Sequence, residues 1–578
     1  MDAQLSVSYA WAPPPLPNEV VNAHPRPYYY LENFQVALDW LRCRYHDLLS
    51  PEEQRFIDDF SRLPIESAAL VVRMIMRQGD LFRTSKLNYS EIGCPRRAAT
   101  PLIELGWIDP DPPLSFPDLF RLLRKAEVNE ALKLPRAARL LRKPELIPLV
   151  GEAIAEIRLL QAWWPEAPDA IFQIRIASLC ERLRLMFFGN FRQTWSEFVL
   201  ADLGIFRYES ISLEPSARAF QTREQIEQFC AIYRCRELLH AQAPVDEVLA
   251  AVPPPLTGEP AGWIEARRAK LLFAIAQRYE KDHNPLQALA VYQLSHHPEA
   301  RIRTIRVLEK LDRLNEAAEL LSLVQRQPAT ELEVQLGARI LSRLNRKLRP
   351  PQSAPAAHRR KSLPARAVRH AWGVLELELP QPDQPLRVEL VVSEHLRTPD
   401  SPVLYVENTL LNALFGLLCW DAIFAPLPGA FFHPFHAAPA DLLEAGFQER
   451  RATQFAACFT QLQTGAYRDT ILATFERKAG LQTPFVAWDW LTREELELAL
   501  DCIPAAHLRG FFQRLLTDMR SNRSGLPDLI QLWPGERRYR LIEVKGPGDR
   551  LQDNQIRWLS FCVARDIPVC VCKVSWRA

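Results

Sequence analysis

The fold is decided by two neighbouring stretches, Gly525-Leu526-Pro527-Asp528-Leu529-Ile530 and Tyr539-Arg540-Leu541-Ile542-Glu543-Val544-Lys545. Their patterns predict two strands, Leu529–Trp533 and Tyr539–Lys545, with Pro534-Gly535 starting the turn between them. The second stretch is apolar on both faces, which is typical of an inner strand of a sheet. Because side chains alternate along a strand, Glu543 and Lys545 share one face, and Asp528 lies beside Glu543 if the strands pair.

These side chains predict a metal-dependent hydrolytic site. A buried pair of carboxylates repels itself unless a cation neutralises it. Carboxylate oxygens suit Mg²⁺ or Mn²⁺, and the adjacent Lys545 can orient or deprotonate a water molecule. The alternative is an ordinary α/β edge with surface ion pairs, which a lone Glu-x-Lys would favour. Here a Pro-Asp dipeptide and a Glu-x-Lys motif fifteen residues later (543 − 528) occur together, which favours the site.

The residues after Lys545 predict a turn, a helix and a further strand. Gly546-Pro547-Gly548 ends the strand, and Asp549 with Gln552 resembles a capping box. A helical face then runs from Leu551 to Cys562, and its one polar residue, Gln555, is predicted to point towards the sheet. Residues 567–574 predict another strand, so a strand–helix–strand crossover between parallel strands is expected.

The stretches 525–528 and 543–551, with Gln555, resemble the signature of the VRR-type nuclease domain of the PD-(D/E)xK superfamily. The resemblance implies a restriction-endonuclease-like α/β fold that binds one or two Mg²⁺ or Mn²⁺ ions. It implies that Asp528, Glu543 and the backbone carbonyl of Val544 bind the metal, while Lys545 serves the attacking water. Further residues of the signature are candidates for substrate binding, namely Asp549, Arg550 and Gln555.

Length and composition describe an intracellular protein of several domains. The 578 residues are 48% hydrophobic and 24% charged, as in soluble globular proteins of three or four domains. The net charge of +2 is nearly neutral, so nucleic-acid affinity must come from local patches. The 11 cysteines contain no Cys-x-x-Cys pairs at the spacing of zinc ligands, which favours reduced thiols. With no signal peptide or transmembrane pattern, we expect a cytoplasmic location, nucleoid-associated if the protein is bacterial.

The composition along the chain predicts a mostly α-helical first two-thirds followed by an α/β domain. The predicted segments are a proline-rich N-terminal segment (1–27), an N-terminal DNA-binding region (28–150), a helical region (151–348), an exposed linker (349–368) and the VRR-type nuclease domain (369–578).

Basic residues are concentrated in the second half of the predicted DNA-binding region (28–150). Residues 121–143 hold eight basic residues against two acidic ones. Two short helices with one basic side suit phosphate contacts, for which Arg136, Arg139 and Lys143 are candidates. This basic module, about 115–150, resembles a SAP-type DNA-binding module; the alternative is a solvated face. Residues 82–89 with Arg96 and Arg97 could line a small winged or helical DNA-contacting unit, but a solvated basic surface is favoured there.

The helical region contains a degenerate repeat, within about 262–345. Residues 287–292 and 316–321 look like two copies of a helical hairpin, offset by 29 residues (316 − 287), against ~34 in tetratricopeptide repeats. The repeats can serve as a rigid spacer, a docking surface for protein partners, or both. The aromatic residues upstream are predicted to be core residues, namely Trp163, Trp164, Phe187, Phe188, Phe191, Trp195 and Phe198.

The nuclease domain is predicted to begin with strands at 374–379, 387–392 and 403–406, followed by an apolar helix over 409–424. Glu407 precedes this helix. Its negative charge can interact favourably with the helix dipole, or its carboxylate can be a third one at the metal site. Residues 416–424 with Glu407 nine residues earlier resemble the Fanconi anaemia-associated nuclease family, in which this glutamate is catalytic and binds metal. The order of a SAP-like module, helical repeats and nuclease agrees with that family. The sequence shows no ubiquitin-binding zinc finger, so a bacterial-type member is expected.

The resemblance implies a structure-selective DNA nuclease that acts on branched double-stranded DNA. It would cut 5′ flaps, degrade DNA from 5′ to 3′ and act in DNA repair, including repair of interstrand crosslinks. The alternatives are a Holliday-junction resolvase or restriction-like endonuclease on the same fold, or a non-catalytic DNA-binding scaffold. Arg520 and Arg523 precede the catalytic Asp528 and are either part of a flexible charged loop or an anion pocket that holds a phosphate.

Overall fold

The computed structural model describes residues 27–134, 138, 141–143, 145–146, 157–202, 204–214, 217–256, 262–348, 372–382, 386–444 and 446–577. The chain forms two compact units. One contains residues up to Phe206 together with Ser212–Glu227, and the other contains Arg207–Ile211 and everything from Gln228 onwards. Among the described residues, no helix is both long and apolar enough to cross a membrane.

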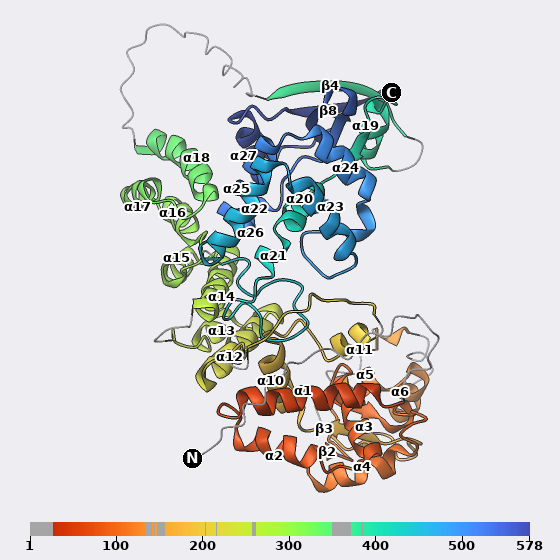
Figure 1. Ribbon diagram of the computed structural model, residues 1–578. Helices are drawn as coiled ribbons and strands as arrows, with labels where there is room; N and C mark the ends of the chain where they lie inside the picture. Colours follow the sequence, from red (N-terminus) through yellow and green to blue (C-terminus); the bar gives the residue numbers. More distant parts are fainter. Residues whose placement is uncertain are drawn as a thin grey trace, which may run out of the picture. The chain divides into compact units, whose positions relative to one another are not determined.

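The first unit combines helices with a small antiparallel sheet (Figure 1). In its described part the strands are β1 (Leu81–Arg83), β2 (Ile108–Asp109) and β3 (Ile171–Ile174), in the order β1-β3-β2. The helices are α1 (Tyr29–Tyr45), α2 (Pro51–Phe60), α3 (Ile65–Ile75), α4 (Pro95–Glu104), α5 (Phe116–Leu122), α6 (Lys125–Ala131), α9 (Leu160–Trp163), α10 (Ala177–Phe188) and α11 (Ser196–Asp202), with a short 3-10 helix at Thr84–Lys86.

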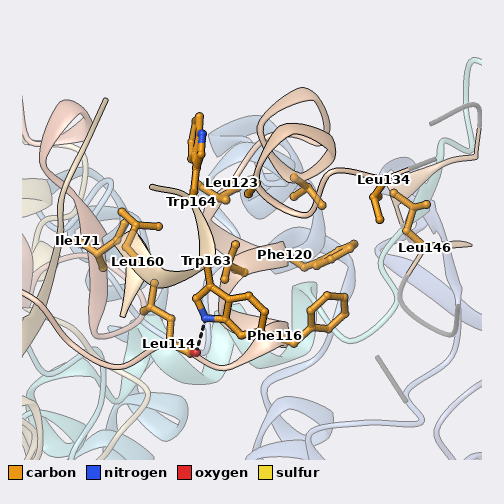
Figure 2. Packing of buried hydrophobic residues seen from close by; sticks show 13 residues of the cluster. Leu114, Phe116, Phe120, Leu123, Leu134, Leu146, Leu160, Trp163, Trp164 and Ile171 are labelled. Atoms are coloured by element: carbon orange, nitrogen blue, oxygen red, sulfur yellow. Dashed lines mark hydrogen bonds between the residues drawn. The ribbon is translucent and has the colours of Figure 1, made fainter. Parts of the chain in front are cut away.

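An apolar cluster holds α5 and α6 together with α9 and β3 (Figure 2). Phe116 and Phe120 lie on one face of α5, with their ring centroids 4.5 Å apart. The indole N–H of Trp163 donates to the carbonyl of Leu114 at 3.0 Å, so its polar atom is satisfied inside the cluster. The aromatic residues predicted to be core are buried, except Phe191, which is half-buried.

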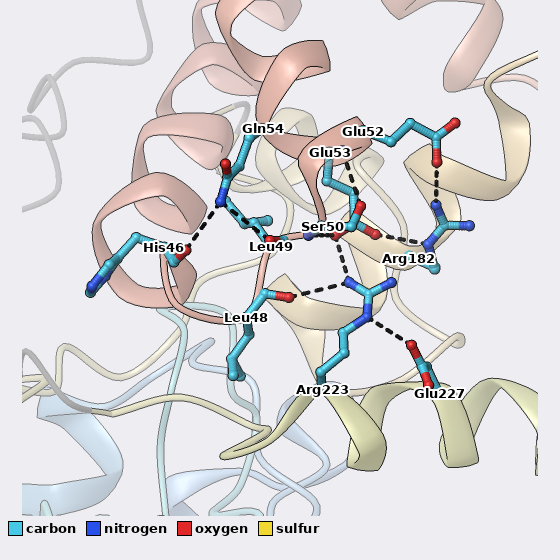
Figure 3. A network of polar contacts seen from close by, with 10 residues as sticks. All are labelled: His46, Leu48, Leu49, Ser50, Glu52, Glu53, Gln54, Arg182, Arg223 and Glu227. Atoms are coloured by element: carbon cyan, nitrogen blue, oxygen red, sulfur yellow. Dashed lines mark hydrogen bonds and ion pairs between the residues drawn. The ribbon is translucent and has the colours of Figure 1, made fainter.

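A buried charged cluster ties α2 to α10 and to the start of α12 (Arg223–His240) (Figure 3). Glu53 is fully buried and accepts from Arg182 Nε at 2.8 Å and from an Arg223 guanidinium nitrogen at 2.6 Å. Burial raises the pKa of Glu53, but the two guanidinium groups outweigh burial and lower it. Glu53 also closes a capping box with Ser50, which explains where α2 begins.

The helical part of the second unit is a run of helices in which, from α13 to α18, each packs on the next. It comprises α12, whose first residues belong to the first unit, then α13 (Val245–Ala250), α14 (Gly262–Lys281), α15 (Pro285–Leu294), α16 (Ala300–Lys310), α17 (Leu314–Arg326) and α18 (Glu331–Leu348). The two predicted repeat copies lie in α15 and α17.

The rest of the second unit is built on a mixed sheet that reads β4-β8-β7-β6-β5 within the described residues. These strands are β4 (Gly373–Pro380), β5 (Val403–Tyr405), β6 (Leu529–Trp533), β7 (Arg538–Lys545) and β8 (Val569–Arg577). β6 pairs antiparallel with β5 and β7, while β8 pairs parallel with β7 and β4. The predicted strands at 529–533 and 539–545, the inner position of the second and the parallel crossover are therefore confirmed.

Helices pack on this sheet and separate β5 from β6 in the sequence. One precedes β5, α19 (Val388–Leu396), and one connects β7 to β8, α27 (Asp553–Val563). Between β5 and β6 lie α20 (Leu410–Leu418), α21 (Trp420–Ile423), α22 (Ala452–Thr464), α23 (Tyr467–Arg477), α24 (Arg493–Cys502), α25 (Ala505–Thr517) and α26 (Met519–Asn522), with short 3-10 helices at Glu449–Arg451 and Trp488–Trp490; another, Pro534–Glu536, joins β6 to β7.

Three local predictions were wrong. Residues 387–392 form the start of α19, because their valines pack as one helical face on the sheet core. The region 151–348, predicted to be helical, also contains a strand, since β3 completes the small sheet. Asp549 does not cap the last helix: its carboxylate accepts from the Gly546 N–H at 3.0 Å, and Gln552 with Gln555 forms the capping box.

Candidate active site

Three neighbouring strands bring Glu407, Asp528 and Glu543 to one end of the sheet. Leu529 is opposite Ile542 in the antiparallel register, so the residue before Leu529 comes beside the residue after Ile542. Tyr405 is opposite Leu529 on the other side, and the Val406 N–H donates to the Asp528 carbonyl at 2.8 Å. The predicted pairing of Asp528 with Glu543 is confirmed by this register.

Glu543 is a buried carboxylate with one satisfied oxygen. Its Oε1 accepts from the Lys545 ammonium at 2.6 Å, while its buried Oε2 has no hydrogen-bond partner among the described residues. The side chain is completely inaccessible to solvent. Burial, and then the negative charge of Asp528, raise the pKa of Glu543 to about 8. A carboxyl group in this state binds either a proton or a cation readily.

Asp528 lies beside it and is also buried. Its Oδ2 accepts from the backbone N–H of Val544 at 2.8 Å, which fixes the carboxylate against β7. Burial raises the pKa of Asp528 to about 6, although the Val544 N–H and the Lys545 charge act in the opposite direction. The two carboxyl groups therefore share an environment in which their joint ionisation is unfavourable without a positive partner.

Asp528 and Glu543 suit a hard divalent cation. They offer carboxylate oxygens, and the unpaired Oε2 of Glu543 is a ligand atom that no group of the described chain satisfies. No three His, Cys, Asp or Glu side chains in the described part of the chain are already arranged around a common metal position. Lys545 holds one oxygen of Glu543, so two carboxylates and this ammonium form the prearranged part of the site.

Glu407 lies at the same end of the sheet but points elsewhere. It is exposed, and its Oε2 accepts from the Tyr405 hydroxyl. Its charge contributes to raising the pKa of both Asp528 and Glu543, which places it within electrostatic reach of the pair. The neighbouring Asn408 has a left-handed backbone (φ 52°) and accepts from the Leu526 N–H at 3.2 Å. Asn408 thus ties the end of β5 to the loop before Asp528.

The sequence reasoning missed Glu389, whose charge also raises the pKa of Asp528. It lies in the first turn of α19, next to Val388. A Cβ added at Gly546 would lie 3.2 Å from Val388 Cγ2, so this turn packs directly on the loop after Lys545. The residue was missed because 387–392 was predicted to be a strand; the spacing Val388, Val391, Val392 is the helical signal that could have found it.

The candidate substrate-binding residues after β7 occupy a turn and a helix cap. Asp549 and Arg550 are exposed, and the Asp549 carboxylate closes the turn at Gly546. Gln555 is half-buried, and its Oε1 accepts from the Gln552 N–H at 2.8 Å. Among these residues, Arg550 is the one exposed cation.

The two arginines before Asp528 differ in their surroundings. Arg523 donates to the Pro484 carbonyl at 2.6 Å, lies over the Phe485 ring, and has its pKa lowered by burial. Arg520 is exposed, and its charge, with that of Lys270, adds to burial in lowering the pKa of His297. Arg520 therefore lies within electrostatic reach of His297, on which the nearby Glu299 acts in the opposite direction, whereas the Arg523 guanidinium is held by internal contacts.

The basic module lies only partly within the described residues. Arg136 and Arg139 lie outside them. Lys143 donates to the Leu123 carbonyl at 2.6 Å, and burial lowers its pKa, so this ammonium already has a partner. Arg83, one of the basic residues considered upstream, is buried and paired with Glu127 and Asp169.

Comparison with known proteins places this geometry in a family. A family model for the "FAN1, HTH domain" matches residues 28–109, and one for the "VRR-NUC domain" matches residues 462–576. A Fanconi-associated nuclease 1 homolog from Pseudomonas aeruginosa is 49% identical over 96% of this chain and 97% of its own length. The chain belongs to the Fanconi-associated nuclease 1 family.

More distant members and solved structures agree. The Fanconi-associated nuclease 1 proteins of Oryza sativa and Homo sapiens are 26% and 24% identical over 94% of this chain, which spans 62% of their length. A crystal structure of paFAN1 bound to 2nt 5′ flap DNA with gap has a TM-score of 0.90 at 48% identity, and covers 96% of this chain and 100% of its own. A second structure, of paFAN1 bound to 1nt 5′ flap DNA with gap, has a TM-score of 0.88. The expected family and fold class are therefore confirmed: a mostly helical N-terminal region precedes a VRR-type nuclease domain.

Proposed function

We propose that the chain is a structure-selective DNA nuclease that hydrolyses phosphodiester bonds at 5′ flaps. The observation that carries the proposal is the buried pair of Asp528 and Glu543 with Lys545, on a chain 48% identical to a protein crystallised with 5′ flap DNA. We further propose that it degrades DNA from 5′ to 3′ and acts in DNA repair, including interstrand crosslink repair, as a cytoplasmic enzyme that is nucleoid-associated if the protein is bacterial.

Asp528, Glu543 and the backbone carbonyl of Val544 would hold Mg²⁺ or Mn²⁺, one or two ions, with Glu407 turning from Tyr405 to join them. The bound cation would act as a Lewis acid and would lower the pKa of a water molecule bound to it. Lys545, whose Nζ lies 2.6 Å from Glu543, would orient the attacking water as an ammonium, and it could take a proton from that water only as the neutral amine, after losing its own proton. The Val544 N–H keeps the Asp528 carboxylate in one orientation, so little rearrangement is needed before reaction.

The enzyme would select its cutting site by the structure of the DNA and not by its base sequence. Phosphate contacts and DNA bending would serve this selection, because neither requires the protein to read the bases. Arg520 would hold a phosphate upstream of the scissile bond, supported by the charge of Lys270, since both cations act on His297. Arg550 and the basic module would contact the duplex backbone, with Asp549, Gln555 and Arg523 shaping the loops that present these contacts.

The test is cleavage of end-labelled 5′-flap, 3′-flap and four-way-junction DNA with Mg²⁺ or Mn²⁺. We expect rapid cutting of the 5′ flap, slower cutting of the others, and none in Glu543→Gln. Preferential cutting of the four-way junction would favour a junction resolvase instead. Binding of all three substrates without metal-dependent cutting of any would leave a DNA-binding scaffold.

A further inference from the structure

One face of α18 contacts the nuclease part of the same unit. Glu331, Gln335 and Arg339 follow one another at intervals of four residues, so they form a single row along the helix. Glu331 binds the Arg514 guanidinium of α25 through both oxygens, at 3.0 and 2.7 Å. The next two residues of the row reach α27.

The contact with α27 is made at its first turn. Gln335 donates to the Asp553 carbonyl at 3.3 Å and accepts from Arg557 at 2.8 Å, so one amide joins two successive turns of α27. Arg339 pairs with the Asp553 carboxylate at 2.5 Å. The ion pair is half-exposed, with 50% of the Arg339 side chain and 36% of that of Asp553 accessible, so solvent screens it and it adds little to stability.

The same turn of α27 is packed against the loop that carries Asp528. A Cβ added at Gly525 would lie 2.7 Å from Asn554 Cγ and 2.9 Å from its backbone carbonyl carbon. Gly525 has φ +83°, a conformation that glycine adopts freely. Asn554 follows Asp553, and Gly525 precedes Asp528 by three residues. The helical repeat, the first turn of α27 and the catalytic loop are therefore in continuous contact.

We propose that Gln335 and Arg339 are positioning residues of the nuclease site: α18 fixes the first turn of α27, which fixes Gly525 and thereby the Asp528 carboxylate. The helical repeats thus contribute directly to catalytic geometry, a role beyond that of a spacer or docking surface. The inference rests on the proposed nuclease function for its kinetic consequence, but its structural consequence is independent of it.

The test compares Gln335→Ala/Arg339→Ala with the wild type in single-turnover cleavage of a 5′ flap at saturating DNA. We expect the rate to fall about 10- to 100-fold, because a small misplacement of a catalytic group costs this much. DNA affinity without metal and the thermal transition should stay unchanged. Arg339→Lys in the otherwise native chain should keep most of the rate, because it keeps the charge opposite Asp553. Arg346→Ala is the matched control, since Arg346 is an exposed arginine of α18 whose Nε bonds to Ser342 of its own helix.

Amide hydrogen exchange supplies the second readout. In the double variant, exchange should accelerate at residues 522–530 and 553–557 and remain as in wild type in α14 to α17. A native cleavage rate together with native exchange at 522–530 would overturn the positioning role. A wild type that cuts no 5′ flap would overturn the proposed function alone, because the exchange comparison would still decide this inference.

Discussion

Replacing Glu543 by glutamine should make the metal-free protein more stable at neutral pH while abolishing cleavage. The reason is that burial raises the pKa of Glu543 from 4.5 to about 8. The native state therefore binds a proton that the unfolded chain releases, so native stability falls as the pH rises from about 4.5 to about 8. Glutamine has the shape of the protonated carboxyl and does not titrate, so the variant escapes this loss.

The magnitude follows from the pKa difference. A pH of 7 is 2.5 pH units above the pKa of 4.5 of the unfolded carboxyl, so that group is ionised. The native carboxyl, with a pKa of about 8, is still mostly protonated at this pH. At about 1.4 kcal/mol per unit, Glu543→Gln should gain about 3 kcal/mol at pH 7 and almost nothing near pH 4.5. This value is an upper limit, because Asp528 titrates in the same window and the two groups are coupled.

The assay is thermal and urea unfolding of metal-free wild type and variant between about pH 5 and pH 8, the window set by the two pKa values. Glu376→Gln, an exposed glutamate on the edge strand β4, is the control and should follow the wild type. Mn²⁺ should stabilise the wild type more at high pH than at low pH, since it binds the ionised carboxylates, and should have less effect on Glu543→Gln. Parallel unfolding curves for wild type and Glu543→Gln across this range would refute the reasoning.

Four further predictions concern activity. Asp528→Ala should abolish cleavage and weaken Mn²⁺ binding measured by calorimetry, whereas Lys545→Ala should abolish cleavage and leave Mn²⁺ binding nearly unchanged. Near-native cutting by either variant would show that the replaced residue is not part of the site. Glu407→Gln should lose cleavage but keep DNA binding in a mobility-shift assay, and a lowered thermal transition instead would return Glu407 to a structural role. Reversing the charges of Arg136 and Arg139 in the basic module, with Lys143 left native because it bonds to Leu123, should reduce the salt slope of duplex binding by about one unit per lost phosphate contact, and an unchanged slope would mean a solvated face. Arg520→Ala should remove a preference for a 5′-phosphate over a 5′-hydroxyl on a one-nucleotide flap, whereas a wild type that cuts both ends equally would exclude the pocket.

The sequence predicted best where chemistry and strand pattern coincide. β6 has the predicted bounds, and β7 extends the prediction by one residue, because the alternation around Glu543 and the Pro534-Gly535 turn leave little freedom of register. Their pairing places Asp528 beside Glu543 by register alone. In contrast, the β-branched valines at 388, 391 and 392 favour a strand by residue type, whereas their spacing and their packing on the sheet core are those of the helix α19.

Contacts between residues far apart in the sequence could not be predicted from local sequence patterns. The Lys143 bond to Leu123 and the Arg523 bond to Pro484 turn charges that sequence assigned to DNA into internal contacts. Glu407 was found by family resemblance, since an exposed glutamate at a strand end carries no local signal that separates a metal ligand from a solvated residue. Gln335 and Arg339 carried no signal at all, because their partners lie more than 200 residues away.

The position of β8 also has a consequence for the biosynthesis of the protein. β8 lies between β7 and β4 and pairs with both, although it ends at Arg577. While a ribosome is still making this strand, β4 has no neighbour and β7 lacks one of its two partners. We therefore expect the nascent chain to fold its helical regions first and to complete this sheet only after β8 has been translated.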